Sequence, residues 1–179
     1  IVLNCNIPKD AFFYSVFKKV TIGNEVTRIE TGAFRECKIG SIFVPKSVTF
    51  IGDKAFEGCS GELIIDSKII ETDYDYGSEP IKSWLYGSKF TKLTIGDNIT
   101  KIGKRAFEGC KSLASVTIPN SVTEIGEDAF KSCSSLTSIS ISNSVSEIGK
   151  DAFAFCSSLT SITIPNSVTK IGFNPFTGC

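Results

Sequence analysis

The sequence predicts an α/β solenoid with a curved parallel β-sheet on its concave face and short helical or 3₁₀ returns on its convex face. A pattern with a period of about 23 residues runs through the chain. Early in each unit apolar and polar residues alternate, and late in each unit the apolar residues lie three to four positions apart. Such a short unit cannot bury its apolar side alone, so the units are expected to stack.

The repeat is clearest in three consecutive units, which cover residues 113–133, 136–156 and 159–179. They read LASVTIPNSVTEIGEDAFKSC, LTSISISNSVSEIGKDAFAFC and LTSITIPNSVTKIGFNPFTGC. Earlier units in the same register begin at Phe17, Ile39 and Phe90. With irregular coils at 1–16 and 60–89, we expect one solenoid domain over 1–179 with about eight coils.

Each part of the unit has its own pattern. Residues 115–118 alternate between a hydroxyl and an aliphatic side chain, which predicts a strand with one buried face. The Pro-Asn-Ser segment at 119–121 predicts a turn, and Gly126 permits a sharp change of direction. The next apolar residues have the spacing of one face of a short helix or 3₁₀ turn: Ala129, Phe130 and Cys133. Because this return carries a bulky phenylalanine, we expect the sheet on the concave side.

All but one of the seven cysteines take the same position in their units: Cys37, Cys59, Cys110, Cys133, Cys156 and Cys179. Side chains in equivalent positions of stacked coils point the same way, so the sulfurs are expected to stack rather than converge. That arrangement is poor for a disulfide or a metal site. The prediction is a column of buried free thiols and no metal, with Cys5 outside the column.

The composition narrows the classes of function. Histidine is absent, and with it the commonest general base and metal ligand at neutral pH. The sequence contains no recognisable nucleophile–base pair, catalytic carboxylate pair or phosphate loop, so we expect neither an enzyme nor a cofactor. Basic and acidic residues are equal at 19 each, which gives no reason to expect nucleic acid. No apolar run is long enough to span a bilayer, so no membrane insertion is predicted.

The outward positions of the predicted strands are the first candidate binding site. Small hydroxyls predominate there, Phe43 is the one large apolar residue, and the rows leave a shallow trough for another molecule; an ordinary solvated face is the alternative. The residues are Lys19, Thr21, Ser41, Phe43, Lys92, Thr94, Ser115, Thr117, Ser138, Ser140, Ser161 and Thr163. A second candidate is the insertion in the coil at 60–89, where Tyr74, Tyr76 and the neighbouring Tyr86 offer aromatic surfaces for a sugar.

The repeated unit resembles the BspA-like branch of leucine-rich repeats, which reads roughly LxxIxIPxxVxxIGxxAFxxC. The match is complete across about 90–179, good across 17–59 and weak in the irregular coils. The resemblance implies a leucine-rich-repeat solenoid located on the cell surface or secreted. It also implies an adhesion or protein-interaction module whose partner is a protein or glycan on another cell or in extracellular matrix. A carbohydrate-binding or scaffold domain of a larger surface protein is the alternative, and the oligomeric state stays open.

Overall fold

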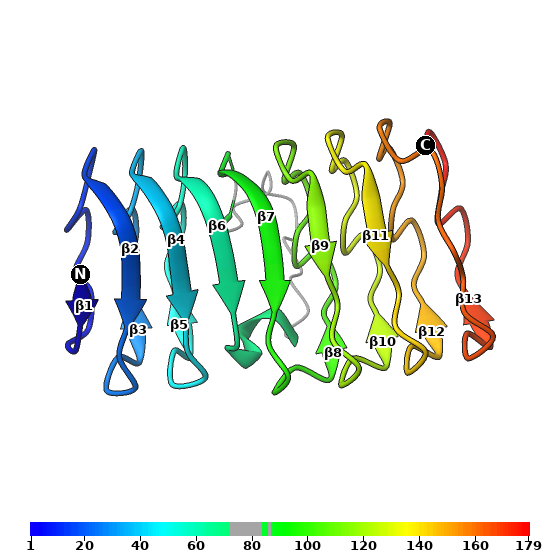
Figure 1. Ribbon diagram of the computed structural model, residues 1–179, viewed down its shortest axis with the longest axis horizontal. Helices are drawn as coiled ribbons and strands as arrows, with labels where there is room; N and C mark the ends of the chain where they lie inside the picture. The colour runs from blue at the N-terminus through cyan, green and yellow to red at the C-terminus, as the bar shows by residue number, and fades with distance from the viewer. Residues whose placement is uncertain (72–83, 86) are drawn as a thin grey trace.

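The chain is described by a computed structural model, which covers residues 1–71, 84–85 and 87–179. The coils lie side by side in chain order along the long axis of the molecule (Figure 1). Each regular coil up to residue 156 supplies a strand to a main ladder, turns, and then supplies a two-residue strand to a second ladder. The predicted parallel β-solenoid is therefore confirmed.

The main ladder is a seven-stranded sheet in which all paired strands are parallel, in the order β1-β2-β4-β6-β7-β9-β11. Its strands are β1 (Val2–Leu3), β2 (Val16–Ile22), β4 (Lys38–Val44), β6 (Ser60–Ile65), β7 (Lys89–Ile95), β9 (Ser115–Thr117) and β11 (Ser138–Ser140). One register row of this sheet is buried throughout: Val20, Ile42, Leu63, Leu93, Val116 and Ile139. The inward positions predicted from the alternation are thus the core positions.

The second ladder is interrupted at the coil that carries the insertion. On one side β3 (Arg28–Ile29) pairs with β5 (Phe50–Ile51). On the other side the strands are β8 (Lys101–Ile102), β10 (Glu124–Ile125), β12 (Glu147–Ile148) and β13 (Lys170–Ile171). Between them lies the 3₁₀ helix η1 (Lys68–Glu71), and the amide of Gly103 donates to the carbonyl of Ile70 at 2.6 Å. The irregular coil at 60–89 therefore supplies β6 to the main ladder and has η1 in place of a strand of the second ladder.

The returns of the regular coils are successive turns, so the prediction of helical or 3₁₀ returns is not confirmed. The amide of Ala129 donates to the carbonyl of Gly126 within its own coil, at 3.3 Å. The next amide, of Phe130, donates instead to Ala152 in the following coil, at 2.8 Å. Because every second amide bonds to the following coil, it is not available for a hydrogen bond within a helix. Asp128 also has a left-handed φ of 56°, which a right-handed helix does not contain.

Helix is scarce throughout the part of the chain that the structure describes. The four-residue η1 is the one helical segment there. No helix in these ranges is long and apolar enough to cross a membrane.

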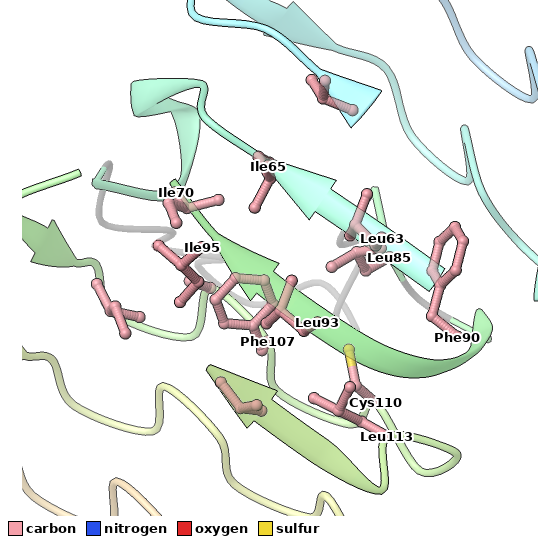
Figure 2. Close-up of a cluster of buried hydrophobic side chains, with 14 of the residues drawn as sticks. Leu63, Ile65, Ile70, Leu85, Phe90, Leu93, Ile95, Phe107, Cys110 and Leu113 are labelled. Carbon is pink, nitrogen blue, oxygen red and sulfur yellow. The ribbon is translucent and has the colours of Figure 1, made fainter. Parts of the chain in front are cut away.

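A column of stacked aromatic rings fills the return side, as the repeat predicts. Phe130 lies between Phe107 and Phe153, with ring centroids 5.3 and 5.5 Å away. In the irregular coil, Trp84 takes the phenylalanine position and packs edge-on against Phe56 at 5.8 Å. Figure 2 shows the same core around β6 and β7, where leucines from both strands meet the return side chains.

The structure shows what the thiols of the cysteine column contact. All seven cysteines are free, as predicted. The thiol of Cys133 donates to the carbonyl of Phe107 at 3.3 Å, and the thiol of Cys156 donates to that of Phe130 at 3.2 Å. Each of these thiols thus ties its coil to the one before it. Burial raises the pKa of the Cys110 thiol to about 12, which suppresses the reactive thiolate at neutral pH.

Thiol titration tests this description of the cysteines. Cys5 and, contrary to the uniform column expected from the sequence, Cys179 are exposed, whereas the other five are buried. In the native protein we expect a disulfide-forming reagent to react rapidly with Cys5, more slowly with Cys179, and with no other cysteine. Unfolding without reductant should release all seven thiols. Finding fewer after unfolding would demonstrate a disulfide and contradict the column.

Candidate binding surface

The exposed side of the main ladder, which we call the sheet face, consists of the solvent-facing residues of β2, β4, β6, β7, β9 and β11. Strand register aligns these residues in two rows, with neighbouring strands about 4.8 Å apart. The first row is Lys19, Ser41, Glu62, Lys92, Ser115 and Ser138. The second row is Thr21, Phe43, Ile64, Thr94, Thr117 and Ser140. The structure therefore brings together the predicted residues on these strands.

The predicted rows extend one coil too far. Ser161 and Thr163 are exposed but lie outside any strand, since the pairing of the main ladder ends at β11. The coil at 159–179 contributes only β13, to the second ladder. Sequence similarity to the preceding coils therefore overestimated the sheet, because a strand also needs ladder hydrogen bonds to its neighbour.

Two residues of the sheet face are missing from the sequence-based set. Glu62 and Ile64 lie on β6 in the irregular coil and complete the two rows. Ile64 pairs directly with Phe43, and both side chains are partly exposed. Phe43 is thus one half of an apolar pair rather than the single large apolar residue. The alternation of Glu62 to Ile65 was the signal that would have identified them.

The charges on the sheet face are only partly balanced. The Nζ atom of Lys92 lies 2.8 Å from a carboxylate oxygen of Glu62. Lys19 is exposed and makes no ion pair with any other residue that the structure describes. An ion pair between half-exposed side chains adds little stability. It does balance the charge of Lys92, so this side chain attracts an acidic partner less than Lys19 does.

The sheet face is broad in its first half and narrow in its second. β2, β4 and β7 have seven residues each and β6 has six, whereas β9 and β11 have three. Two glycines allow the broad strands to pack closely. A Cβ atom on Gly40 would overlap the carbonyl oxygen of Lys18, and one on Gly61 would overlap that of Ile39. The largest continuous area is therefore on β2 to β7, around Phe43 and Ile64.

The alternative site on the insertion lies outside the described residues, which include none of Tyr74, Tyr76 and Tyr86. A groove of about 450 Å³ lies beside η1, away from the sheet face. Its lining residues are Lys46, Val48, Thr49, Lys68, Ile69 and Asn98.

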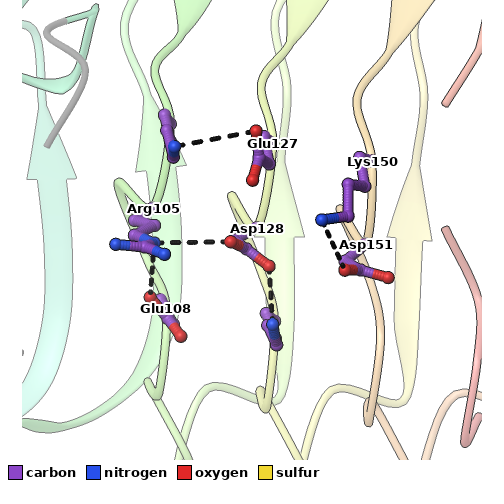
Figure 3. Close-up of polar contacts among 8 residues, drawn as sticks. Arg105, Glu108, Glu127, Asp128, Lys150 and Asp151 are labelled. Carbon is purple, nitrogen blue, oxygen red and sulfur yellow. Dashed lines mark hydrogen bonds and ion pairs between the residues drawn. The ribbon is translucent and has the colours of Figure 1, made fainter. Parts of the chain in front are cut away.

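Charged side chains on the return side form ion pairs with one another. Asp128 is almost fully buried and lies 3.3 Å from Arg105 and 2.8 Å from Lys131 (Figure 3). Burial, followed by the negative charge of Asp128, raises the pKa of Glu108 above its ordinary value. Ion pairs also join neighbouring coils along the second ladder, with Lys101–Glu124 at 3.2 Å and Lys170–Glu147 at 2.6 Å.

A stack of parallel coils with aliphatic residues at fixed inward positions defines the leucine-rich-repeat class of solenoid. The family described as BspA type Leucine rich repeat region matches the chain in six copies, over residues 5–76 and 81–179. The chain belongs to this family.

Solved structures are similar over most of the chain. A leucine rich cell surface protein from Faecalibacterium prausnitzii is 29% identical with a TM-score of 0.52, and the match covers 92% of this chain and 51% of that one. The T. pallidum leucine rich repeat protein TpLRR is 27% identical with a TM-score of 0.51, over 74% of this chain and 51% of that one. The chain thus spans about half the length of these two proteins. A search of curated proteins gave no match.

Proposed function

We propose that this chain is an adhesion or protein-interaction module, on the cell surface or secreted, that binds another macromolecule through the sheet face. The partner is a protein or glycan on another cell or in extracellular matrix. Membership of the BspA type family supports this, as does the similarity to a bacterial cell surface protein. We further propose that the sheet lies on the concave side, because the bulky phenylalanines are on the return side.

The partly exposed apolar pair Phe43–Ile64 carries the proposal. Exposed aliphatic and aromatic side chains on a hydroxyl-rich sheet lose water-accessible area when a partner covers them. The core does not need them, since the buried rows of β4 and β6 lie on the opposite side of the same strands. Binding is thus the role that their exposure supports.

Carbohydrate binding or a scaffold role within a larger surface protein is the alternative function. Sugar sites favour exposed Tyr or Trp platforms. The described strands of the main ladder contain neither residue type. This favours a protein partner for the sheet face. Tyr74, Tyr76 and Tyr86 are the residues that would bind a sugar under the alternative. Deleting residues 72–83 should leave binding unchanged if the sheet face is the site.

Replacing Phe43 with Ser is expected to weaken binding at least about tenfold, because a central aromatic anchor commonly contributes more than 1.4 kcal/mol. The partner is first identified by screening the purified chain against host extracellular proteins and glycans, and affinities are then measured by calorimetry. Stability should fall little, since Phe43 is partly exposed in the free protein.

Phe50→Ser is the matched control. Phe50 is more exposed than Phe43, but it lies on β5 in the second ladder and stacks under Arg28 at 3.9 Å. We expect this variant to bind with unchanged affinity. A partner whose affinity is insensitive to Phe43→Ser, or that responds equally to Phe50→Ser, would place the site elsewhere.

A further inference from the structure

One end of the sheet face is basic. Lys18 and Lys19 lie on β2 and Lys38 begins β4, and all three side chains are exposed. None of them makes an ion pair with another residue in the described ranges. The whole chain has a formal net charge of +0, so this concentration of lysines is a local feature.

The acidic residues beside this cluster are already paired. Glu36 lies 3.6 Å from Lys89 at the start of β7, and Glu62 lies 2.8 Å from Lys92. These contacts neutralise both carboxylates without involving the three lysines of β2 and β4. We call Lys18, Lys19 and Lys38 the lysine cluster.

Register places Lys19 of the lysine cluster close to the apolar pair. Lys19 aligns with Ser41, and two residues further along the same strands Thr21 aligns with Phe43. Two residues of a strand span about 7 Å, so one ligand segment crossing the strands can contact both features. Basic and apolar surface thus adjoin on the broad half of the sheet face.

We infer that the sheet face binds an acidic polypeptide segment that carries at least one large apolar side chain. The apolar side chain packs on Phe43 and Ile64, and neighbouring carboxylates face the lysine cluster. This inference rests on the proposed function and specifies its partner. Opposite charge speeds association and discriminates between partners, whereas the apolar contact supplies most of the affinity.

A sulfated glycan is the other negatively charged ligand to consider, and the apolar pair distinguishes it from an acidic polypeptide. A sulfated glycan satisfies the lysines but leaves Phe43 and Ile64 without an apolar counterpart. A polypeptide supplies carboxylates and an aliphatic or aromatic side chain within a few residues of each other. The observations therefore favour the polypeptide, and a glycan becomes an outcome of the test.

Fluorescently labelled synthetic peptides and a heparin oligosaccharide are the probes, and binding is measured by fluorescence anisotropy. The first peptide set combines Glu and Asp with a central Phe or Leu. The second replaces the acids by Gln and Asn, and the third replaces the apolar residue by Ser. We expect the first set to bind at least about tenfold more tightly than either other set. Raising the ionic strength from about 0.01 M to about 0.15 M should weaken that binding, because the Debye length shortens from about 30 Å to about 8 Å.

The decisive variant reverses the cluster, with Lys18→Glu, Lys19→Glu and Lys38→Glu together. Its control carries the same change of charge on the second-ladder side, with Lys104→Glu, Lys150→Glu and Lys170→Glu. Circular dichroism confirms that both variants are folded, and Lys→Ala versions replace any that is not. We expect the cluster variant to lose at least about tenfold in affinity for the acidic peptides and the control to lose little.

Three results would overturn the inference. The first is that the acidic peptides bind no more tightly than their neutral counterparts. The second is that the two charge-reversed variants bind with equal affinity. The third is that heparin binds through the cluster and Phe43→Ser does not change its affinity. If the partner found by screening still responds to Phe43→Ser but not to reversal of the cluster, the proposed function stands and only this partner class fails. If it responds to neither, both fail.

Discussion

Truncating Phe130 to Ala is expected to lower the free energy of unfolding by about 3–5 kcal/mol, the usual cost of removing a buried phenylalanine. The side chain of Phe130 is 0% exposed and is stacked between Phe107 and Phe153. The backbone on both sides is fixed by hydrogen bonds between coils, such as the one from the Phe130 amide to Ala152. The cavity therefore cannot collapse easily, and the loss affects the contacts to two neighbouring coils.

Phe173→Ala is the control for this substitution, because the Phe173 side chain is 72% exposed. Chemical denaturation of both variants should show a change within about 0.5 kcal/mol for Phe173→Ala, as for other surface substitutions. A cost below about 1 kcal/mol for Phe130→Ala would show that the aromatic column does not hold the coils together.

Gly149→Ala is expected to cost about 1–3 kcal/mol or more, the range for forcing extra volume into a packed site. A Cβ atom at this position would lie 2.5 Å from both the backbone nitrogen of Glu127 and the carbonyl carbon of Gly126. These are main-chain atoms of the preceding coil, so no side-chain rotation relieves the overlap. The two coils would have to separate locally, which weakens the second ladder between β10 and β12.

Gly109→Ser is the matched control for the glycine substitution. Nothing lies within 4 Å of the position of its Cβ, and Ser132 occupies the equivalent left-handed position in the next coil with φ 60°. Its expected cost is less than about 1 kcal/mol, mostly from the backbone conformation. Equal costs for the two variants, measured by thermal or chemical denaturation, would mean that the coils are not in close backbone contact at Gly149.

The stacking and the inward positions were predictable because they follow from periodicity alone. Leucine, valine and isoleucine recur at fixed intervals, and equivalent residues must then occupy equivalent places in the core. The same logic predicted the stacked Phe130 column and the unpaired thiols. In the irregular coil, Trp84 takes the phenylalanine position and contacts Phe56 edge-on.

The structure of the returns was not predictable from spacing. Apolar residues three or four apart mark one face of a helix, but successive turns bring side chains to one face at the same intervals. The distinction lies in the amides, such as that of Phe130, which bond to the following coil. The spacing of apolar residues within one coil gives no sign of a hydrogen bond to a residue about 22 positions away.

The candidate site was predictable where the strands are regular and not elsewhere. Glu62 and Ile64 were omitted because the candidate rows were taken from the regular coils only. Ser161 and Thr163 were included although their segment has no ladder partner. Lys18 follows Phe17 and precedes Lys19, so strict alternation selects only one of the two exposed lysines. The basic character of the sheet face therefore became visible only with the register of β2 and β4.

The central claim, that a partner sits on the sheet face, is tested most directly by site-specific photo-crosslinking. A benzophenone analogue of phenylalanine is placed at position 43 in one protein and at position 50 in another, and each is irradiated with the purified partner. We predict a covalent adduct with the partner from position 43 on β4 and none from position 50 on β5. An adduct from position 50 alone would contradict the claim.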